Sequence, residues 1–444
     1  MTHRSLASLL VLALWAGVPT AFGAESNPAK PADGPQNPTQ NQDLRKQRME
    51  QDEAMRNTPV ADRKSEEYAA TGIKLGTFLL LPDLRLEESF KDNIYATASN
   101  TVEDYVTLFK PVIHGQSDWT RHQLQFDAEG SFFRYLENST ENHNDFMTRV
   151  SGKLDIVEGS WLEVTPGWSR NHEDRGSPDN VNGADPTRSD QYGAKLEYVY
   201  EPARVKLKVT GNSQKYNFQD ARTPTGFINN DDRDRRENSL VTRVWMETDP
   251  DNRKDFLFLQ PTLGSVAYDE TVDDGGLHRD ANVWRLDAGY GFRASGKLVG
   301  EAFVGLMGRH HEDPALKDFT DWTAGTNLIW NLTPLTTLTT ILQRTIGETT
   351  VAAAGSIVQT SFNLQLDHEL LRNAKIGVKT GYANSNYQSL TRKDDNVKAG
   401  LFGNYQFDRN LYAGVEYQFI DNSSTAVNSN FQQNVLSAHV GYRF

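Results

Sequence analysis

The chain has 444 residues and a formal net charge of −13 at pH 7, from 59 acidic and 46 basic side chains. This balance argues against a general nucleic-acid-binding protein, which would present a basic surface. The absence of cysteine excludes disulfides and thiol chemistry, and a hydrophobic content of 37% argues against a protein built from membrane-spanning helices.

Residues 1–24 have the pattern of a secretory signal peptide. His3 and Arg4 precede an apolar stretch from Leu6 to about Val18, and small residues follow it. Such a stretch is too short for a stable membrane span, although an N-terminal anchor is the alternative interpretation. No later stretch approaches ~18 consecutive apolar residues, so we expect no transmembrane helix.

Residues 25–72 differ in composition from the rest of the chain. The first part is rich in Pro, Asn and Gln, and the second part is highly charged with few large apolar side chains. This composition predicts a disordered or partly helical periplasmic extension. A plain spacer and a binding segment are both open interpretations of it.

From residue 73 to residue 444 the chain repeats segments in which apolar and polar side chains alternate. Near the end, for example, Val397, Leu401 and Tyr405 fall on one side of an extended strand, whereas Lys398 and Asn404 fall on the other. Period-two alternation is typical of a strand with one apolar and one polar face. We count about eighteen such segments. They are 74–90, 103–115, 119–136, 144–158, 161–172, 190–201, 203–217, 237–249, 254–268, 280–293, 297–310, 319–331, 335–346, 356–368, 373–385, 396–407, 410–420 and 432–444.

Two features favour a membrane barrel over a soluble β-sandwich. Short connections such as 158–161 and 407–410 alternate with long polar ones such as 171–191 and 217–238, as in outer-membrane barrels. Tyr, Trp and Phe also cluster near the strand ends on the apolar face, which is the expected aromatic girdle. The sequence therefore predicts an all-β fold, a transmembrane antiparallel β-barrel of 16–18 strands whose two ends both face the periplasm.

Closure of the barrel and its internal prolines both affect how the strands can pair. Lipid offers no partner to an open sheet edge, so the last strand must pair with the first. Four prolines, at positions 82, 111, 166 and 261, fall inside expected strands. Because proline lacks an N–H group, we expect local bulges there.

The polar faces of the strands are expected to line an aqueous lumen, since a barrel of this size is too wide for its side chains to fill. Both signs of charge occur, which suits either passage of a polar polymer or cross-lumen ion pairs that stiffen the wall. The expected lumen-lining residues are Arg85, Lys110, Arg149, Lys153, Lys206, Lys208, Arg243, Arg285, Asp287, Arg293, Glu301, Lys375, Lys379, Lys398 and Glu416.

The sequence gives no sign of catalysis, of a cofactor or of a metal site. Histidines are scattered, and no Ser lies in a nucleophile-elbow pattern. His310 and His311 lie beside acidic residues, but neighbours in a strand point to opposite faces. We therefore expect no enzymatic activity, no cofactor and no bound metal.

The segments "GTFLLLPDLRLEESFKDNIYAT" and "VTLFKPVIHGQSDWTRHQLQFDAEGSFFRYLENSTENHNDF" resemble the second β-barrel porin family of Gram-negative bacteria. The matching features are the opening strand with a mid-strand Pro82, the Asp92–Thr97 loop, the turn from Pro111 to His122 and the terminal "GYRF". The resemblance implies an outer-membrane barrel, and some members accompany polysaccharide assembly systems.

The predicted function is an outer-membrane pore, in the first place for export of an exopolysaccharide. The alternatives are a diffusion porin for small hydrophilic solutes and a structural barrel with a blocked lumen. Expected partners are outer-membrane lipid, lipopolysaccharide, the barrel assembly machinery, and polysaccharide with its periplasmic export components, but no nucleic acid. Tyr442 and Phe444, on the apolar face of the last strand, are the expected assembly signal.

Overall fold

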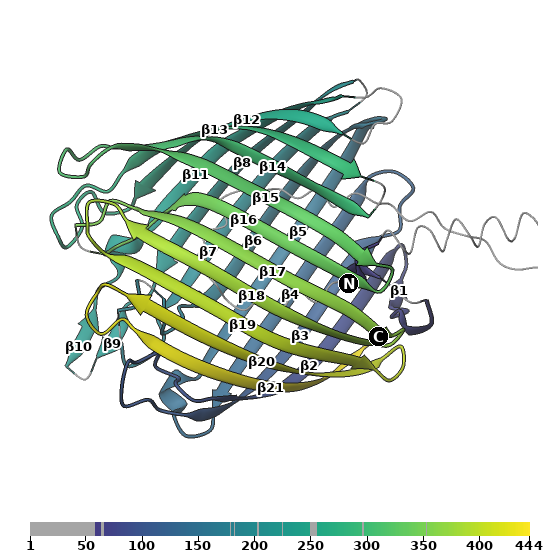
Figure 1. Cartoon of the computed structure of the whole chain (residues 1–444), viewed down its shortest axis with the longest axis horizontal. Coiled ribbons are helices and arrows are strands. Elements are labelled where there is room, and N and C mark those ends of the chain that lie inside the picture. Colours follow the sequence, from purple (N-terminus) through teal and green to yellow (C-terminus); the bar gives the residue numbers. More distant parts are fainter. Residues whose placement is uncertain are drawn as a thin grey trace, which may run out of the picture.

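Figure 1 shows a computed structural model of the chain, which describes residues 58–63, 66–177, 179–181, 183–201, 204–223, 225–248, 255–294, 297–351 and 353–444. The expected signal peptide and most of the segment 25–72 lie outside these residues. Within the described residues, no helix is both long enough and apolar enough to cross a membrane.

The described residues form one closed antiparallel barrel of eighteen strands. Each strand pairs with its neighbours in chain order, and β2 pairs with both β3 and β21, which closes the sheet. The barrel strands are β2 (Phe78–Lys91), β3 (Asp104–Ser117), β4 (Gln123–Tyr135), β5 (His143–Val157), β6 (Ser160–His172), β7 (Arg188–Tyr200), β8 (Val205–Phe218), β11 (Arg235–Glu247), β12 (Phe256–Tyr268), β13 (Ala281–Ala294), β14 (Leu298–His311), β15 (Phe319–Thr333), β16 (Thr336–Gly347), β17 (Ile357–Leu371), β18 (Ala374–Tyr387), β19 (Lys393–Gln406), β20 (Leu411–Ser424) and β21 (Phe431–Arg443).

The predicted fold class and strand count are confirmed. Each expected segment overlaps one barrel strand, but the first of them contains a tight turn that separates the short β1 (Ile73–Leu75) from β2. The structure also contains a small hairpin of β9 (Ala221–Thr223) and β10 (Gly226–Ile228) inside the expected loop 217–238. Its strands of three residues are too short for a period-two signal.

The connections differ in length between the two ends of the barrel (Figure 1). One end, which we call the short-turn end, carries the connections 158–159, 334–335 and 372–373, and the C-terminal end of β21 lies there. The opposite, long-loop end carries the longest connections, 173–187 and 219–234 among them. The predicted sorting of short and long connections is therefore present in the fold.

The expectation of bulges at the internal prolines is wrong. At Pro111, Pro166 and Pro261 the ladder to one neighbouring strand skips two residue pairs and then resumes in the same register. The ladder to the other neighbour continues through each proline. A missing N–H group removes a ladder bond on one side only, so no extra residue is required.

Pro82 lies at the seam where the barrel closes. The β2–β21 ladder ends at the pair Asp83 and Arg443, and the next main-chain nitrogen, that of Phe444, donates to the Pro82 carbonyl oxygen at 3.1 Å. Pro82 cannot donate in return. Instead, the Gly72 nitrogen donates to the Phe444 carbonyl oxygen at 3.0 Å, which completes the edge.

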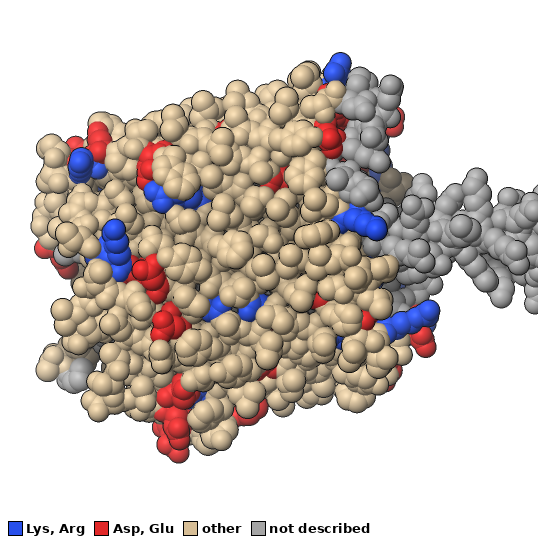
Figure 2. Space-filling model, in the orientation of Figure 1, with Lys and Arg blue, Asp and Glu red and all other residues tan. Residues whose placement is uncertain are grey.

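The outer surface of the wall is apolar. Leu263, Val304 and Leu401 are between 58% and 67% exposed, and charged side chains are few over the middle of the face in Figure 2. Trp322 and Trp330, near opposite ends of β15, are about half exposed on this surface. An exposed apolar band with aromatic residues at its borders is the pattern of a lipid-facing barrel wall.

Candidate functional site

The opposite face of the sheet is polar and forms the inner wall. In β2, Leu84 and Leu86 are exposed on the outside, whereas Arg85 and its neighbour Glu87 point inward and are mutually paired. Strand pairing carries this alternation around the whole sheet. By register, all the expected lumen-lining residues fall on the inner face, although the side chain of Arg293 is not among the described ones. Whether any of them contacts a solute stays a prediction.

Most of these inner basic side chains are matched by an acid on the same face. Most pairs connect neighbouring strands or neighbouring positions of one strand, whereas Arg243–Glu301 and Lys379–Glu416 reach past at least one intervening strand. Together these pairs form a belt of both charge signs around the wall. Outside this pattern, Lys375 donates to the Val60 carbonyl oxygen at 2.7 Å. The belt pairs are Lys110–Glu129 at 2.5 Å, Arg149–Asp127 at 3.0 Å, Lys153–Asp155 at 3.7 Å, Lys206–Glu247 at 2.9 Å, Lys208–Glu197 at 2.8 Å, Arg243–Glu301 at 3.1 Å, Arg285–Asp287 at 2.7 Å and Lys379–Glu416 at 3.2 Å.

The connection 173–187, which we call the mouth loop, extends across the long-loop end. It leaves the wall at β6, yet the Asp179 carboxylate accepts a 2.7 Å hydrogen bond from the Thr349 hydroxyl, which belongs to the connection between β16 and β17. These strands lie on nearly opposite sides of the closed sheet. Gly176 lies against the ring of Phe431 at the start of β21. The described parts of the mouth loop therefore narrow the lumen.

Buried ion pairs fix the base of the mouth loop. Glu173 accepts two hydrogen bonds from Arg233 of the connection 219–234, at 3.1 and 2.7 Å, and both side chains are nearly inaccessible. Arg175 binds the buried Glu141 carboxylate and also donates to the Gly183 carbonyl oxygen at 2.8 Å. Buried charges persist only when they are paired in this way, so these contacts resist displacement of the loop.

A second group of contacts holds the far side of the mouth. Arg279 donates to the main-chain carbonyl oxygens of Thr349 and Ala354 at 3.0 and 2.9 Å. Arg309 donates to the Glu348 carboxylate, which also accepts from the Tyr268 hydroxyl at 3.0 Å. Burial by itself would raise the pKa of Glu348, but the adjacent Arg309 guanidinium outweighs it and holds that pKa below its ordinary value.

Burial raises the pKa of two other carboxyl groups near the mouth. The pKa of Asp179 lies above its ordinary value, although Arg233 and the Thr349 hydrogen bond oppose the shift. Burial likewise raises the pKa of Asp234 to about 6, against a hydrogen bond from the Phe218 main-chain nitrogen. Both groups therefore have a higher pKa in the packed loops than in water, which is the basis of the pH dependence predicted below.

At the short-turn end, residues 58–63 lie against the inner wall. The Val60 nitrogen donates to the Thr337 hydroxyl at 2.9 Å, and Arg63 pairs with Glu369 at 3.0 Å. Both wall residues belong to the inner face, on β16 and β17. Val60 is fully buried within a 3-10 turn, Val60–Asp62. No pattern in the sequence predicts this contact, because a lone valine in a polar segment carries no periodicity.

Two groups of side chains within the described residues could hold a metal ion. One consists of His143, Asp145 and His172, and the other of His278, Asp280 and Glu312. The sequence alone predicts no metal site. Its only signal for the first group was the His-x-Asp spacing at 143–145, which puts both side chains on one face of a strand. His310 and His311, considered from the sequence, are in neither group.

The aromatic pair at the C-terminal end of the chain faces outward. Tyr442 and Phe444 are 45% and 38% exposed, and their rings meet edge to face at 5.1 Å between centroids. No described contact tests their expected role as an assembly signal.

The comparisons with known proteins give one strong result. A family model described as Putative beta-barrel porin 2 matches residues 66–444. No curated protein matched the chain.

Solved outer-membrane proteins of Pseudomonas aeruginosa also match. OpdK is 14% identical with a TM-score of 0.43, over 82% of this chain and 99% of its own. OccK2 (OpdF) is 11% identical with a TM-score of 0.47, over 84% and 100% of the two chains. OccK9 (OpdG) is 12% identical with a TM-score of 0.46, over 83% and 98%. Similarities this weak say nothing about what this chain transports.

Proposed function

Because the chain belongs to the β-barrel porin 2 family of the Gram-negative outer membrane, we propose that it forms a pore for small hydrophilic solutes. In this membrane the short-turn end faces the periplasm and the long-loop end faces outward, as in other such barrels. Solutes would pass the mouth loop and then move along the two-signed inner wall.

The position of the mouth loop is the observation that carries this proposal. Because this loop is joined to the opposite side through Asp179 and Thr349, we expect the mouth to admit a small solute more readily than a polymer. A polymer chain would require the buried pair of Glu173 and Arg233 to separate. Breaking a buried pair costs about 3–5 kcal/mol, so a wide passage is disfavoured at rest.

The paired charges of the inner wall predict weak selection between ions. A ring of one sign would set a strong preference, but pairs such as Arg243–Glu301 and Lys379–Glu416 cancel much of the local field. Such a wall suits neutral or zwitterionic polar solutes, to which it offers both donors and acceptors. We also propose that the pore carries no enzymatic chemistry of its own.

Export of an exopolysaccharide, which the sequence predicts in the first place, is the second candidate. The two-signed wall would also accommodate a polar polymer, provided that the mouth loop moves aside. Export would involve polysaccharide and periplasmic components as partners, whereas a diffusion pore requires only the outer-membrane lipid around it.

Purified protein in planar bilayers tests the proposal. We expect discrete conductance steps, a cation-to-anion permeability ratio near one, and faster swelling of proteoliposomes in small sugars than in large oligosaccharides. Failure to conduct, under conditions where a general porin conducts, would overturn it. Deletion in the native organism separates the candidates, because loss of secreted polysaccharide with periplasmic accumulation would favour export.

A further inference from the structure

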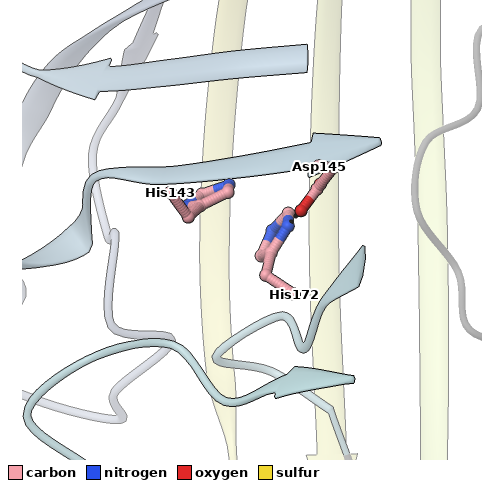
Figure 3. A group of neighbouring side chains, drawn as sticks. All are labelled: His143, Asp145 and His172. Atoms are coloured by element: carbon pink, nitrogen blue, oxygen red, sulfur yellow. Dashed lines mark hydrogen bonds and ion pairs between the residues drawn. The ribbon is translucent and has the colours of Figure 1, made fainter. Parts of the chain in front are cut away.

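Three side chains converge at the long-loop end, at the base of the mouth loop (Figure 3). His143 and Asp145 lie two residues apart at the start of β5, and His172 is the last residue of β6. One ligand atom from each lies within 4.8 Å of the other two. None of the belt pairs or mouth-loop anchors described above uses these side chains.

The hydrogen bond at one ring nitrogen of His143 determines whether the other nitrogen is protonated or has a free lone pair. Its Nδ1 lies 2.7 Å from the Glu141 carbonyl oxygen. Because a carbonyl oxygen only accepts, Nδ1 carries the proton and Nε2 presents a lone pair. That Nε2 atom is buried and has no hydrogen-bond partner within the described part of the chain, and the whole residue is only 3% exposed.

Asp145 presents a second acceptor of the same kind. One of its carboxylate oxygens lies 2.7 Å from His172 Nδ1, whereas the other, Oδ1, is buried and has no partner among the described residues. His143 Nε2 and Asp145 Oδ1 are both acceptors, so neither can satisfy the other, and each buried unsatisfied group costs about 1–3 kcal/mol. A cation bound between them would satisfy both.

The surrounding rings hold these ligands in place. His143 stacks between Phe133, at 4.4 Å between centroids, and His172, at 3.6 Å. The Glu141 carbonyl orients His143 from behind, which is the usual support of a metal-binding imidazole. Asp174 Oδ1, at the start of the mouth loop, lies 3.5 Å from His172 Nε2, the ring nitrogen opposite the one beside Asp145, and can fix the orientation of that ring.

We propose that His143, Asp145 and His172 form a binding site for one divalent transition-metal ion such as Zn²⁺. Imidazole nitrogen and carboxylate oxygen are the donors that zinc, copper and nickel share. The bound ion links the end of β6 to the start of β5, next to the mouth loop.

The other candidate group, which contains His278, has no buried ligand atom that lacks a hydrogen-bond partner among the described residues. His278 lies 3.4 Å from Asp280 and 3.9 Å from Glu312, and all three side chains are partly exposed. His278 therefore supplies the matched control.

Calorimetric titration of the full-length barrel in detergent, without a polyhistidine tag, with ZnCl₂ tests the site. We expect one ion per chain. We expect His143→Gln and Asp145→Asn each to weaken binding on the order of a hundredfold, since even loss of a group that orients a ligand costs about 10–100-fold. His278→Gln should bind as the parent does. No binding to the parent protein, or unchanged binding by His143→Gln, would overturn the proposal.

A measurement on the parent protein covers the case in which a variant fails to fold. Cu²⁺ added at one equivalent should give an electron paramagnetic resonance spectrum with superhyperfine splitting from two imidazole nitrogens. A spectrum with fewer than two nitrogen ligands would contradict a site built on both His143 and His172.

Discussion

The Asp179 carboxylate accepts a 2.7 Å hydrogen bond from the Thr349 hydroxyl, although the two residues lie 170 positions apart and their loops leave the barrel wall on nearly opposite sides. This contact joins the mouth loop to the wall that it faces. The width of the lumen at this end therefore depends on a few polar contacts between loops. The hydrogen bonds between the barrel strands do not form part of these contacts.

Removal of this contact should widen the pore. A hydrogen bond to a charged group contributes about 1.5–3 kcal/mol, so Asp179→Ala should raise the population with a displaced loop by on the order of tenfold or more. Single-channel recording should show larger or more frequent high-conductance openings. Asp318→Asn, which alters an exposed acid in another connection, is the control. Equal conductance in Asp179→Ala and the parent would contradict a gating role for this contact.

Mild acid should favour the packed loops. Burial raises the pKa of Asp234 to about 6 and also raises the pKa of Asp179. In released loops a carboxyl group would bind its proton only below about pH 4. As the pH falls from about 6 to about 4, proton uptake therefore stabilises the packed arrangement. Conductance at pH 5 should be lower than at pH 7, and Asp234→Asn should reduce this difference. An acid response of undiminished size in that variant would argue against Asp234.

The inner-wall pair Arg243–Glu301 allows a test of ion selection in both directions. Its atoms are 3.1 Å apart, and Arg243 also lies over the ring of Phe258. Glu301→Gln should leave a net positive charge on the wall and shift the reversal potential toward anion selectivity. Arg243→Gln should shift it toward cations, and both shifts should shrink at high salt because of screening. Shifts of the same sign in both variants would show that neither residue lies along the ion path.

Gly441 should be intolerant of a side chain. A Cβ atom at this position would overlap the ring of Tyr412, whose hydroxyl donates to Asp83 at 2.7 Å across the closing seam. Overpacking of this kind costs about 1–3 kcal/mol, so Gly441→Ala should lower the denaturant midpoint of unfolding in detergent. Gly211, within β8, has open space around the same position, and Gly211→Ala should be far milder. Equal midpoints for the two variants would refute the steric explanation.

Residues 58–63 should leave the inner wall when Val60 becomes polar. Val60 is fully buried, whereas its neighbour Ala61 is exposed. Val60→Asp would replace a fully buried apolar side chain by a charged carboxylate beside Thr337, so the segment should detach instead. Limited proteolysis of the folded barrel should then cut this segment faster than in the parent. Ala61→Asp should behave as the parent does, and equal cutting of both variants would count against the contact.

The sequence by itself determined the barrel. Alternation of side chains along segments such as 396–407 predicts strands with one lipid face, and the lack of any partner for an edge in lipid requires closure. These are local or general constraints, so they can be recognised without coordinates. The prolines show the limit of such reasoning, because the chain alone indicates a missing N–H group but not which neighbouring strand loses the bond.

Only the tertiary structure decided which segments pack inside the two ends of the barrel. Asp179 meets Thr349 and Val60 meets Thr337 through packing between segments far apart in the chain. No periodicity specifies such contacts, since loops and single buried residues lack a repeating pattern. The strand pattern therefore determines that there is a barrel, whereas long-range packing at its mouths determines what can pass through it.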